Sequence, residues 1–321
     1  MSIQNQATTL TTYSGLGAIE HFLEKQARYV LLMPAVILLA VLFVYPIIYT
    51  IDLSVHRVNL LNVARGGWPF VGLDNFHDAL TNSDFIHALW VAVFFGGTSL
   101  ILEVALGMIL ALTFNRAFVG KNFLMTICLL PMMMTPIAVG IFWRLLLNSQ
   151  WGIVNYFIGL VGIPRLAWLG DPILAQVSVI GVTFWWQVSF SFLVFLGGLT
   201  ALPVEVFEAA SIDGASRWQS FRYITLPLMI PVILVVVVMR LIDAFRAFDV
   251  VYALTDGGPG NATEVIALQL YDTAFRHQNF SQAAALALLL SVLMLFLTAL
   301  LLRALRARYS GIAGTERSAA L

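Results

Sequence analysis

Long apolar runs and short polar connections alternate along the whole chain. Six of the runs reach the roughly 20 residues that a helix needs to cross about 30 Å of hydrocarbon. These runs cover residues 29–51, 86–114, 123–147, 174–200, 226–248 and 283–302. The pattern predicts an all-α polytopic membrane protein with six transmembrane helices.

The composition supports a membrane protein, since 60% of the residues are hydrophobic and only 11% are charged. The formal net charge of zero gives no reason to expect nucleic acid as a partner. The single cysteine, Cys128, excludes an intrachain disulfide and a cysteine-based metal cluster. Residues 1–28 lack the apolar core of a signal peptide, so we expect the first run to be an uncleaved span.

The basic residues are unevenly divided between the two sets of connecting segments. Ten of the 17 lie in the N-terminus, 115–122, 201–225 and the C-terminal tail, whereas four lie in the other set. The positive-inside rule therefore predicts that both termini and the 201–225 loop are cytoplasmic. We expect a cytoplasmic leader over 1–28, a transmembrane domain over 29–308 and an irregular cytoplasmic tail over 309–321.

The 201–225 loop has the pattern of a short helix, a turn and a second helix. Pro203 ends the preceding apolar run, and Glu205 and Glu208 favour a helix N-terminus. Asp213 and Gly214 then supply a turn that tolerates a positive φ. A polar helical hairpin between two spans is expected to be a docking surface.

The sequence from Glu208 to Pro227 reads E-A-A, three residues, G, nine residues and I-x-L-P. It resembles the coupling motif of bacterial ABC importer permeases and matches every fixed position. In that family the loop is cytoplasmic, and its short helix inserts into a cleft of the ATP-hydrolysing subunit. Small side chains suit a helix that lies closely in such a groove. The resemblance assigns the contact with the ATPase to Glu205, Glu208, Ala209, Ala210, Asp213, Gly214 and Ala215.

The third run contains two prolines, Pro131 and Pro136, on either side of Met132 and its neighbours. Prolines in a span free backbone carbonyls and bend the helix. Resembling permeases have a proline here, where the helix borders the translocation path, so Met132 is a candidate for that path. A simple kink within a packed bundle is the alternative.

The fourth run places polar and aromatic side chains on one helical face. Thr183, Trp186, Gln187 and Phe190 stand at i, i+3, i+4 and i+7. A sugar needs such a face, because its hydroxyl groups require hydrogen-bond partners and its C–H faces stack on rings. An aromatic core stripe with incidental polar groups is the alternative interpretation.

The fifth run repeats this spacing with Arg240, Asp243, Ala244 and Ala247. The two charges could simply pair with each other. The resemblance places both stripes where maltose-type permeases line their sugar site, but Arg240 and Asp243 replace residues that are usually uncharged there. This difference argues against maltose itself. If Asp243 leaves Arg240 incompletely neutralised, the guanidinium could bind an anionic group of the solute.

Glu103 is an ionisable residue in the otherwise apolar second run. Such a residue in a membrane helix often has a function. However, Ala105, Gly107 and Ala111 follow it at helix-packing spacing, so we favour a hydrogen bond between helices over a direct functional role.

Two external segments also resemble elements of sugar-importer permeases. The stretch 68–76 resembles the F-x-G-L-x-N-F element after the first span, where contact with a binding protein and an interfacial lid are equally good interpretations. The stretch 254–259 reads L-T-x-G-G-P, and 271–275 reads Y-x-x-A-F. Both are similar to permeases of the maltose F-subunit type.

The resemblance as a whole implies a type I permease subunit of an ATP-driven carbohydrate importer in the bacterial inner membrane. The chain has no G-x-x-x-x-G-K-[ST] phosphate cradle, so ATP and Mg would be bound by partners. The implied assembly contains a second permease, two ABC ATPases and a solute-binding protein. We find no catalytic or metal-site pattern, which argues against an enzyme. The alternative is an ion-coupled secondary transporter that uses Glu103, Asp243 or Arg240.

Overall fold

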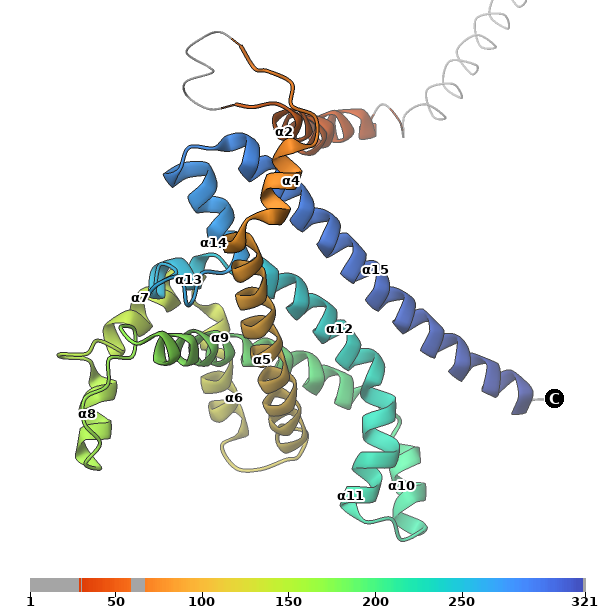
Figure 1. The fold of residues 1–321 in the computed structure, drawn as a ribbon. Coiled ribbons are helices and arrows are strands. Elements are labelled where there is room, and N and C mark those ends of the chain that lie inside the picture. The colour runs from red at the N-terminus through yellow and green to blue at the C-terminus, as the bar shows by residue number, and fades with distance from the viewer. Residues whose placement is uncertain (1–28, 30, 59–66, 320–321) are drawn as a thin grey trace, which may run out of the picture.

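The computed structural model describes residue 29 and residues 31–58 and 67–319, with side chains described as far as Arg303. The predicted leader, 1–28, lies outside this part. The regular secondary structure of the described residues is helical, with one isolated β-bridge between His56 and Phe70, which confirms the all-α prediction. Its longest helices are α5 (Ser83–Phe114), α9 (Pro172–Thr200), α12 (Leu226–Phe245) and α15 (Phe280–Ala319) (Figure 1).

Shorter helical segments connect and extend these four. On the N-terminal side of α9 they are η1 (Ala40–Val44), α2 (Tyr45–Val55), α4 (Asp74–Thr81), α6 (Lys121–Leu129), η2 (Pro131–Met133), α7 (Pro136–Leu146) and α8 (Ile153–Leu160). On its C-terminal side they are α10 (Val204–Ile212), α11 (Arg217–Ser220), η3 (Phe221–Thr225), α13 (Asp249–Leu254), α14 (Ile266–Tyr271) and η4 (Asp272–Arg276).

Five helices in the described part are long and apolar enough to cross a membrane, and they correspond to five of the six predicted spans. They are Leu31–Val55, Ser83–Phe114, Pro172–Thr200, Arg217–Phe245 and Phe280–Arg303. The C-terminal helix α15 continues to Ala319, so the described part of the tail is helical and not irregular as expected. The tail follows directly on residues 303–308, which are all arginine, alanine or leucine and favour helix.

The third predicted span, 123–147, is interrupted instead of merely bent. Its helical pieces are α6, the 3₁₀ turn η2 and α7, and each of the latter two begins at a proline. Proline lacks a backbone N–H and clashes with the preceding turn, which explains the breaks. Freed carbonyls inside a membrane protein need other partners.

The fourth span supplies those partners. The Ser189 hydroxyl donates to the Cys128 carbonyl at 2.6 Å, and the Trp186 indole N–H donates to the Met134 carbonyl at 3.2 Å. Side chains of α9 therefore hold the third span in place by hydrogen bonds to backbone carbonyls on both sides of the 3₁₀ turn η2.

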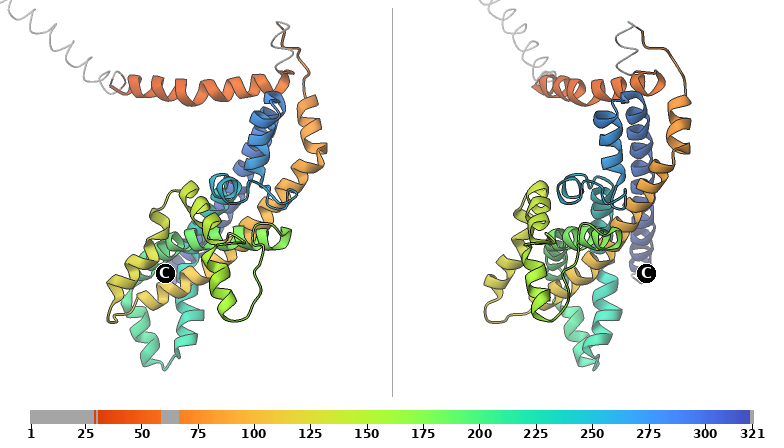
Figure 2. Two further views of the ribbon diagram at one scale, coloured as in Figure 1. Left: turned by 90° about the vertical axis from the view of Figure 1, so that its left-hand side faces the viewer. Right: turned by 60° about the vertical axis from the view of Figure 1, so that its left-hand side comes forward.

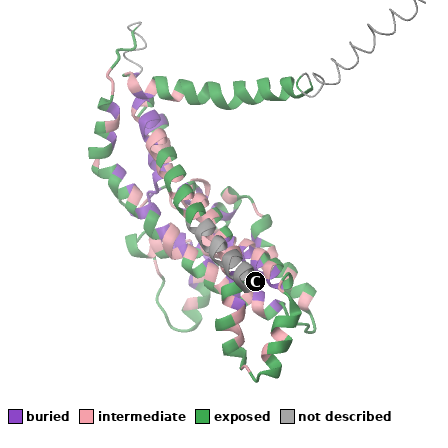
Figure 3. Cartoon of the chain, turned by 90° about the vertical axis from the view of Figure 1, so that its right-hand side faces the viewer, coloured by how far each residue is buried: buried purple, intermediate pink, exposed green. Residues whose placement is uncertain are grey.

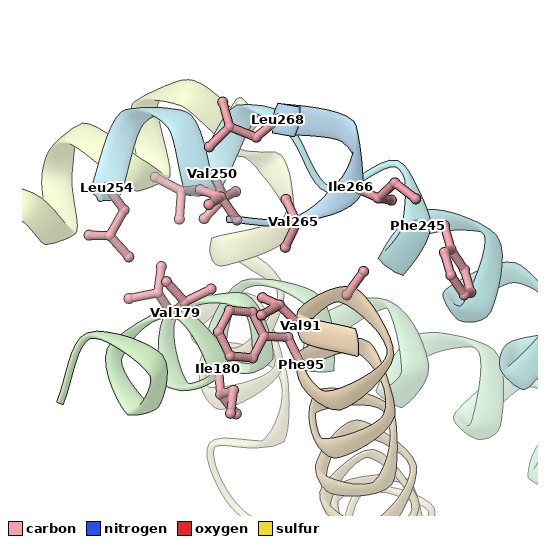
Figure 4. Packing of buried hydrophobic residues seen from close by; sticks show 14 of the residues in the cluster. Val91, Phe95, Val179, Ile180, Phe245, Val250, Leu254, Val265, Ile266 and Leu268 are labelled. Atoms are coloured by element: carbon pink, nitrogen blue, oxygen red, sulfur yellow. The ribbon is translucent and has the colours of Figure 1, made fainter. Parts of the chain in front are cut away.

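Close packing of α5 against α9 forms the centre of the bundle. At Gly107 an added Cβ would lie 2.9 Å from the Cβ of Ser191, so only glycine allows this approach. Figure 4 shows Val91 and Phe95 of α5 near Val179 of α9, with residues of α13 and α14 on the other side of this cluster. The small external helices thus complete the core over the ends of the spans.

Different elements project from the two ends of the molecule. The first span lies across one end and points away from the bundle, whereas α10 and α11 project at the other end (Figure 2). The best 18-residue window of Leu31–Val55 is 0% buried, and Figure 3 shows the helix exposed along its length. Near its C-terminal end the first span is held by Asn75, whose side-chain amide donates to the carbonyls of Ser54 and His56 at 2.7 and 2.9 Å.

Candidate functional site

A cavity of about 340 Å³ lies between α9, α12 and the broken third span. Its volume is at the lower end of the range for small-molecule sites, roughly 300–1,000 Å³. Eight of the nine residues predicted for the substrate path line it, namely Met132, Thr183, Trp186, Gln187, Phe190, Arg240, Asp243 and Ala247. The ninth, Ala244, lines a smaller adjoining cavity of about 30 Å³. The structure therefore brings the two predicted stripes together, while their role in binding a solute stays a prediction.

An ion pair and a cation–π contact fix the position of Arg240. Its Nη2 lies 3.2 Å from Oδ2 of Asp243, and its guanidinium carbon lies 4.2 Å from the ring centre of Phe190. The Arg240 side chain is 12% exposed and that of Asp243 is 45% exposed. The carboxylate is therefore the more accessible member of the pair.

Trp186 presents its ring to the cavity while its one hydrogen-bond donor is already used. The indole N–H donates to the Met134 carbonyl, and the residue is half-buried. What remains for a solute is a flat apolar surface, with the Phe190 ring on the same wall of α9. Such surfaces stack on the C–H faces of sugar rings.

The stripe on the fifth span ends differently from the prediction. Helix α12 ends at Phe245, so Ala247 lies in a turn in which the Phe248 N–H donates to the Arg246 carbonyl at 2.8 Å. This turn adds Arg246, Phe248 and Asp249 to the cavity wall. Sequence reasoning missed these three because it continued the helix to residue 248; the charges of Arg246 and Asp249 at its end were the available signal.

Glu103 lies beside the smaller cavity instead of forming the predicted hydrogen bond. Its Oε2 is buried and has no hydrogen-bond partner among the described residues. Of the small residues predicted to pack here, Gly107 lies against Ser191 and Ala111 is buried, whereas Ala105 is exposed. Gly96, which was not predicted, also packs closely, since an added Cβ would lie 2.5 Å from that of Ala244.

The coupling segment folds into the predicted helix, turn and helix. Helix α10 ends in a Schellman arrangement, in which the N–H groups of Gly214 and Ala215 donate to the carbonyls of Ser211 and Ala210. Gly214 has φ +77°, the left-handed conformation that the sequence required of it. Ser216 and Gln219 then form a capping box at the start of α11.

This hairpin presents its residues to the outside of the chain. All residues predicted to contact the ATPase lie on it, and most are exposed: Glu205, Glu208, Ala209, Asp213 and Gly214, with Ala210 and Ala215 half-buried. Apolar side chains are also exposed on this hairpin, including Ile212, which is 87% exposed, and Trp218, which is 66% exposed. Among the residues that the structure describes, no group of three His, Cys, Asp or Glu side chains could hold a metal ion.

Residues 103–310 match the family model described as "Binding-protein-dependent transport system inner membrane component". The chain belongs to this family. It is therefore a multi-pass inner-membrane protein and a non-catalytic permease subunit of an ABC transport system, as its coupling motif indicated.

Relatives can be aligned with this chain over nearly its whole length. The trehalose/maltose transport system permease protein MalF of Thermococcus litoralis is 35% identical over 288 residues, which cover 89% of this chain and 95% of that protein. The sn-glycerol-3-phosphate transport system permease protein UgpA of Agrobacterium fabrum is 31% identical over 283 residues, covering 87% and 94%. A crystal structure of a bacterial ABC transporter involved in the import of the acidic polysaccharide alginate contains a chain with the same fold, with TM-score 0.77, 23% identity and coverage of 90% and 99%.

Proposed function

We propose that the permease imports a sugar or sugar derivative through the cavity between α9 and α12. The observation that supports this most strongly is the wall of that cavity, where the rings of Trp186 and Phe190 stand beside the charged pair Arg240 and Asp243. Aromatic faces and paired donors and acceptors are the two features that a polyhydroxylated solute requires. An external solute-binding protein would deliver the solute.

The energy for import comes, in this proposal, from two ABC ATPases that bind ATP and Mg. Their contact would be the exposed helix α10 and the turn at Gly214, and a second permease would complete the pathway. ATP-driven closure of the ATPases would move this hairpin, and with it α12, which follows η3 without a break. The cavity would then open alternately to the two sides of the membrane.

The test is uptake of labelled trehalose and of sn-glycerol 3-phosphate into proteoliposomes that contain the complete assembly with its binding protein. We expect uptake of at least one of them to require ATP and Mg inside the vesicles and to be lost in Arg240→Gln. Uptake that is driven by an ion gradient without ATP would instead support the secondary transporter. The two probes are taken from the names of the relatives. Trehalose is uncharged and sn-glycerol 3-phosphate is anionic, so membership of the family does not determine the charge of the solute.

A further inference from the structure

The charges on the wall of the large cavity balance one another. Arg240 and Arg246 are basic, and Asp243 and Asp249 are acidic. Of the central pair, Asp243 is the more exposed, and Arg240 is covered on one face by the Phe190 ring. A solute that approaches Arg240 therefore meets a carboxylate beside it.

A second, smaller chamber lies behind Arg240 and is lined mostly by apolar residues. The smaller cavity shares Thr183, Gln187, Arg240 and Ala247 with the larger one, so these residues separate the two. Four residues that line this chamber each have a buried atom with no hydrogen-bond partner among the described residues: Ser99 Oγ, Glu103 Oε2, Gln187 Oε1 and Arg240 Nε. Glu103 is 2% exposed and Ser99 is 3% exposed.

Buried polar atoms are nearly always hydrogen-bonded, to protein or to ordered water. The chamber measures about 30 Å³, against the roughly 10–15 Å³ that one water molecule requires. Arg240 lines both cavities, with Glu103 on the wall of the smaller one and Asp243 on the wall of the larger one. With Glu103 protonated, the group of Glu103, Arg240 and Asp243 has no net charge; with Glu103 ionised, its charge is −1. In neither state is it positive.

We propose that this site selects uncharged polyhydroxylated solutes and rejects anionic ones. The inference rests on the proposed function of the cavity. Asp243 would accept hydrogen bonds from hydroxyl groups and Arg240 would donate to their oxygens, while Trp186 and Phe190 contact the C–H faces. A phosphate or carboxylate group would face the Asp243 carboxylate without a net positive charge to offset the repulsion.

Two matched pairs of probes test the proposal: trehalose with trehalose 6-phosphate, and glycerol with sn-glycerol 3-phosphate. Binding to the complete purified assembly in nanodiscs is followed by tryptophan fluorescence, with the Trp186→Phe assembly identifying the signal that comes from the cavity. For any pair of probes that binds, we expect the uncharged probe to bind at least about tenfold more tightly than its phosphorylated partner, equivalent to about 1.4 kcal/mol. An anionic member that binds equally or more tightly would overturn the proposal.

The Asp243→Asn assembly provides the second measurement. Because this change removes one negative charge, the net charge of the group rises by one unit. The binding preference for the uncharged probe over its anionic partner should then fall by about tenfold or reverse. Equal weakening of both members would show that Asp243 has only a structural role and would also overturn the proposal. If none of the four probes gives a signal that Trp186→Phe removes, the proposed function of the cavity fails with it.

Discussion

At the scale of single residues, polar groups inside the spans are placed where the backbone or a cavity needs them. Ser189 and Trp186 donate to carbonyls at the interruption of the third span, and Asn155 binds the loop after α8. The Asn155 amide donates to the Leu166 carbonyl at 3.0 Å, and its oxygen accepts from the Trp168 indole N–H at 3.0 Å. Ser189 and Asn155 do this without lining the large cavity, whereas Trp186 also presents its ring to it.

Glu264, between α13 and α14, gives a pH-dependent prediction. Burial raises the pKa of this carboxyl group above its ordinary value of 4.5, and the nearby Asp272 and Asp84 raise it further. The folded protein therefore holds the proton more tightly than the unfolded chain, so the contribution of Glu264 to stability falls as the pH rises above 4.5 through the folded-state pKa.

Glu264→Gln should accordingly raise the melting temperature by roughly 1–3 °C at neutral pH, with a difference that shrinks towards pH 4.5. The measurement is thermal unfolding of the purified protein in detergent across this pH range. Asp78→Asn, an exposed change on α4, is the control and should show no such trend. A melting temperature lowered equally by Glu264→Gln at every pH would contradict this account.

At the scale of elements, the contact between α5 and α9 depends on Gly107. An alanine there would place its Cβ 2.9 Å from Ser191 Cβ and 3.1 Å from the Phe192 backbone nitrogen, which cannot move independently. We expect Gly107→Ala to lower the unfolding free energy by about 1–3 kcal/mol. Thermal unfolding of the purified variant in detergent measures the change.

Gly97 in the same helix provides the matched control. An added Cβ there meets no atom within 4 Å, so Gly97→Ala should be neutral or stabilising by up to about 1 kcal/mol. Equal melting temperatures for the two alanine variants would show that the helices do not depend on this close approach.

The turn at Gly214 gives a prediction about coupling. With φ +77° and open space around its Cα, the position strains any residue with a Cβ without causing a clash. Gly214→Ala should cost about 1–2 kcal/mol in this conformation and reduce the solute taken up per ATP hydrolysed. Gly214→Asn should retain more of the coupling, because asparagine tolerates the left-handed region. Uptake and ATP hydrolysis in proteoliposomes provide the ratio, and the same ratio in both variants as in the unaltered assembly would rule out this role.

The sequence predicted most of these elements because their periodicities are local. Stripes at i, i+3, i+4 and i+7 identified seven residues of the cavity wall, the proline pattern identified Met132, and the turn chemistry identified the hairpin around Gly214. It did not reveal the full break of the third span or the end of α12 at Phe245. The prolines signalled a disturbance of the third span, but its extent also depends on hydrogen-bond donors from α9. The end of α12 depends on the turn that follows it. These partners lie outside the apolar run from which each prediction was made.

At the scale of the whole molecule, this chain exposes surfaces that only an assembly and a bilayer can cover. None of the residues in the most apolar part of the first span is buried, and the hairpin formed by α10 and α11 exposes Ile212 and Trp218. A membrane component of a transport system is expected to have such surfaces, because its partners and lipid complete it.

The central claim is that the cavity between α9 and α12 holds the transported solute. The most direct test is a cryo-electron microscopy structure of the complete assembly, trapped with a non-hydrolysable ATP analogue and its solute-loaded binding protein. We predict solute density within hydrogen-bond distance of Arg240 or Asp243 and in contact with the Trp186 ring. Solute bound elsewhere along the pathway, with these residues in contact only with one another, would contradict the account.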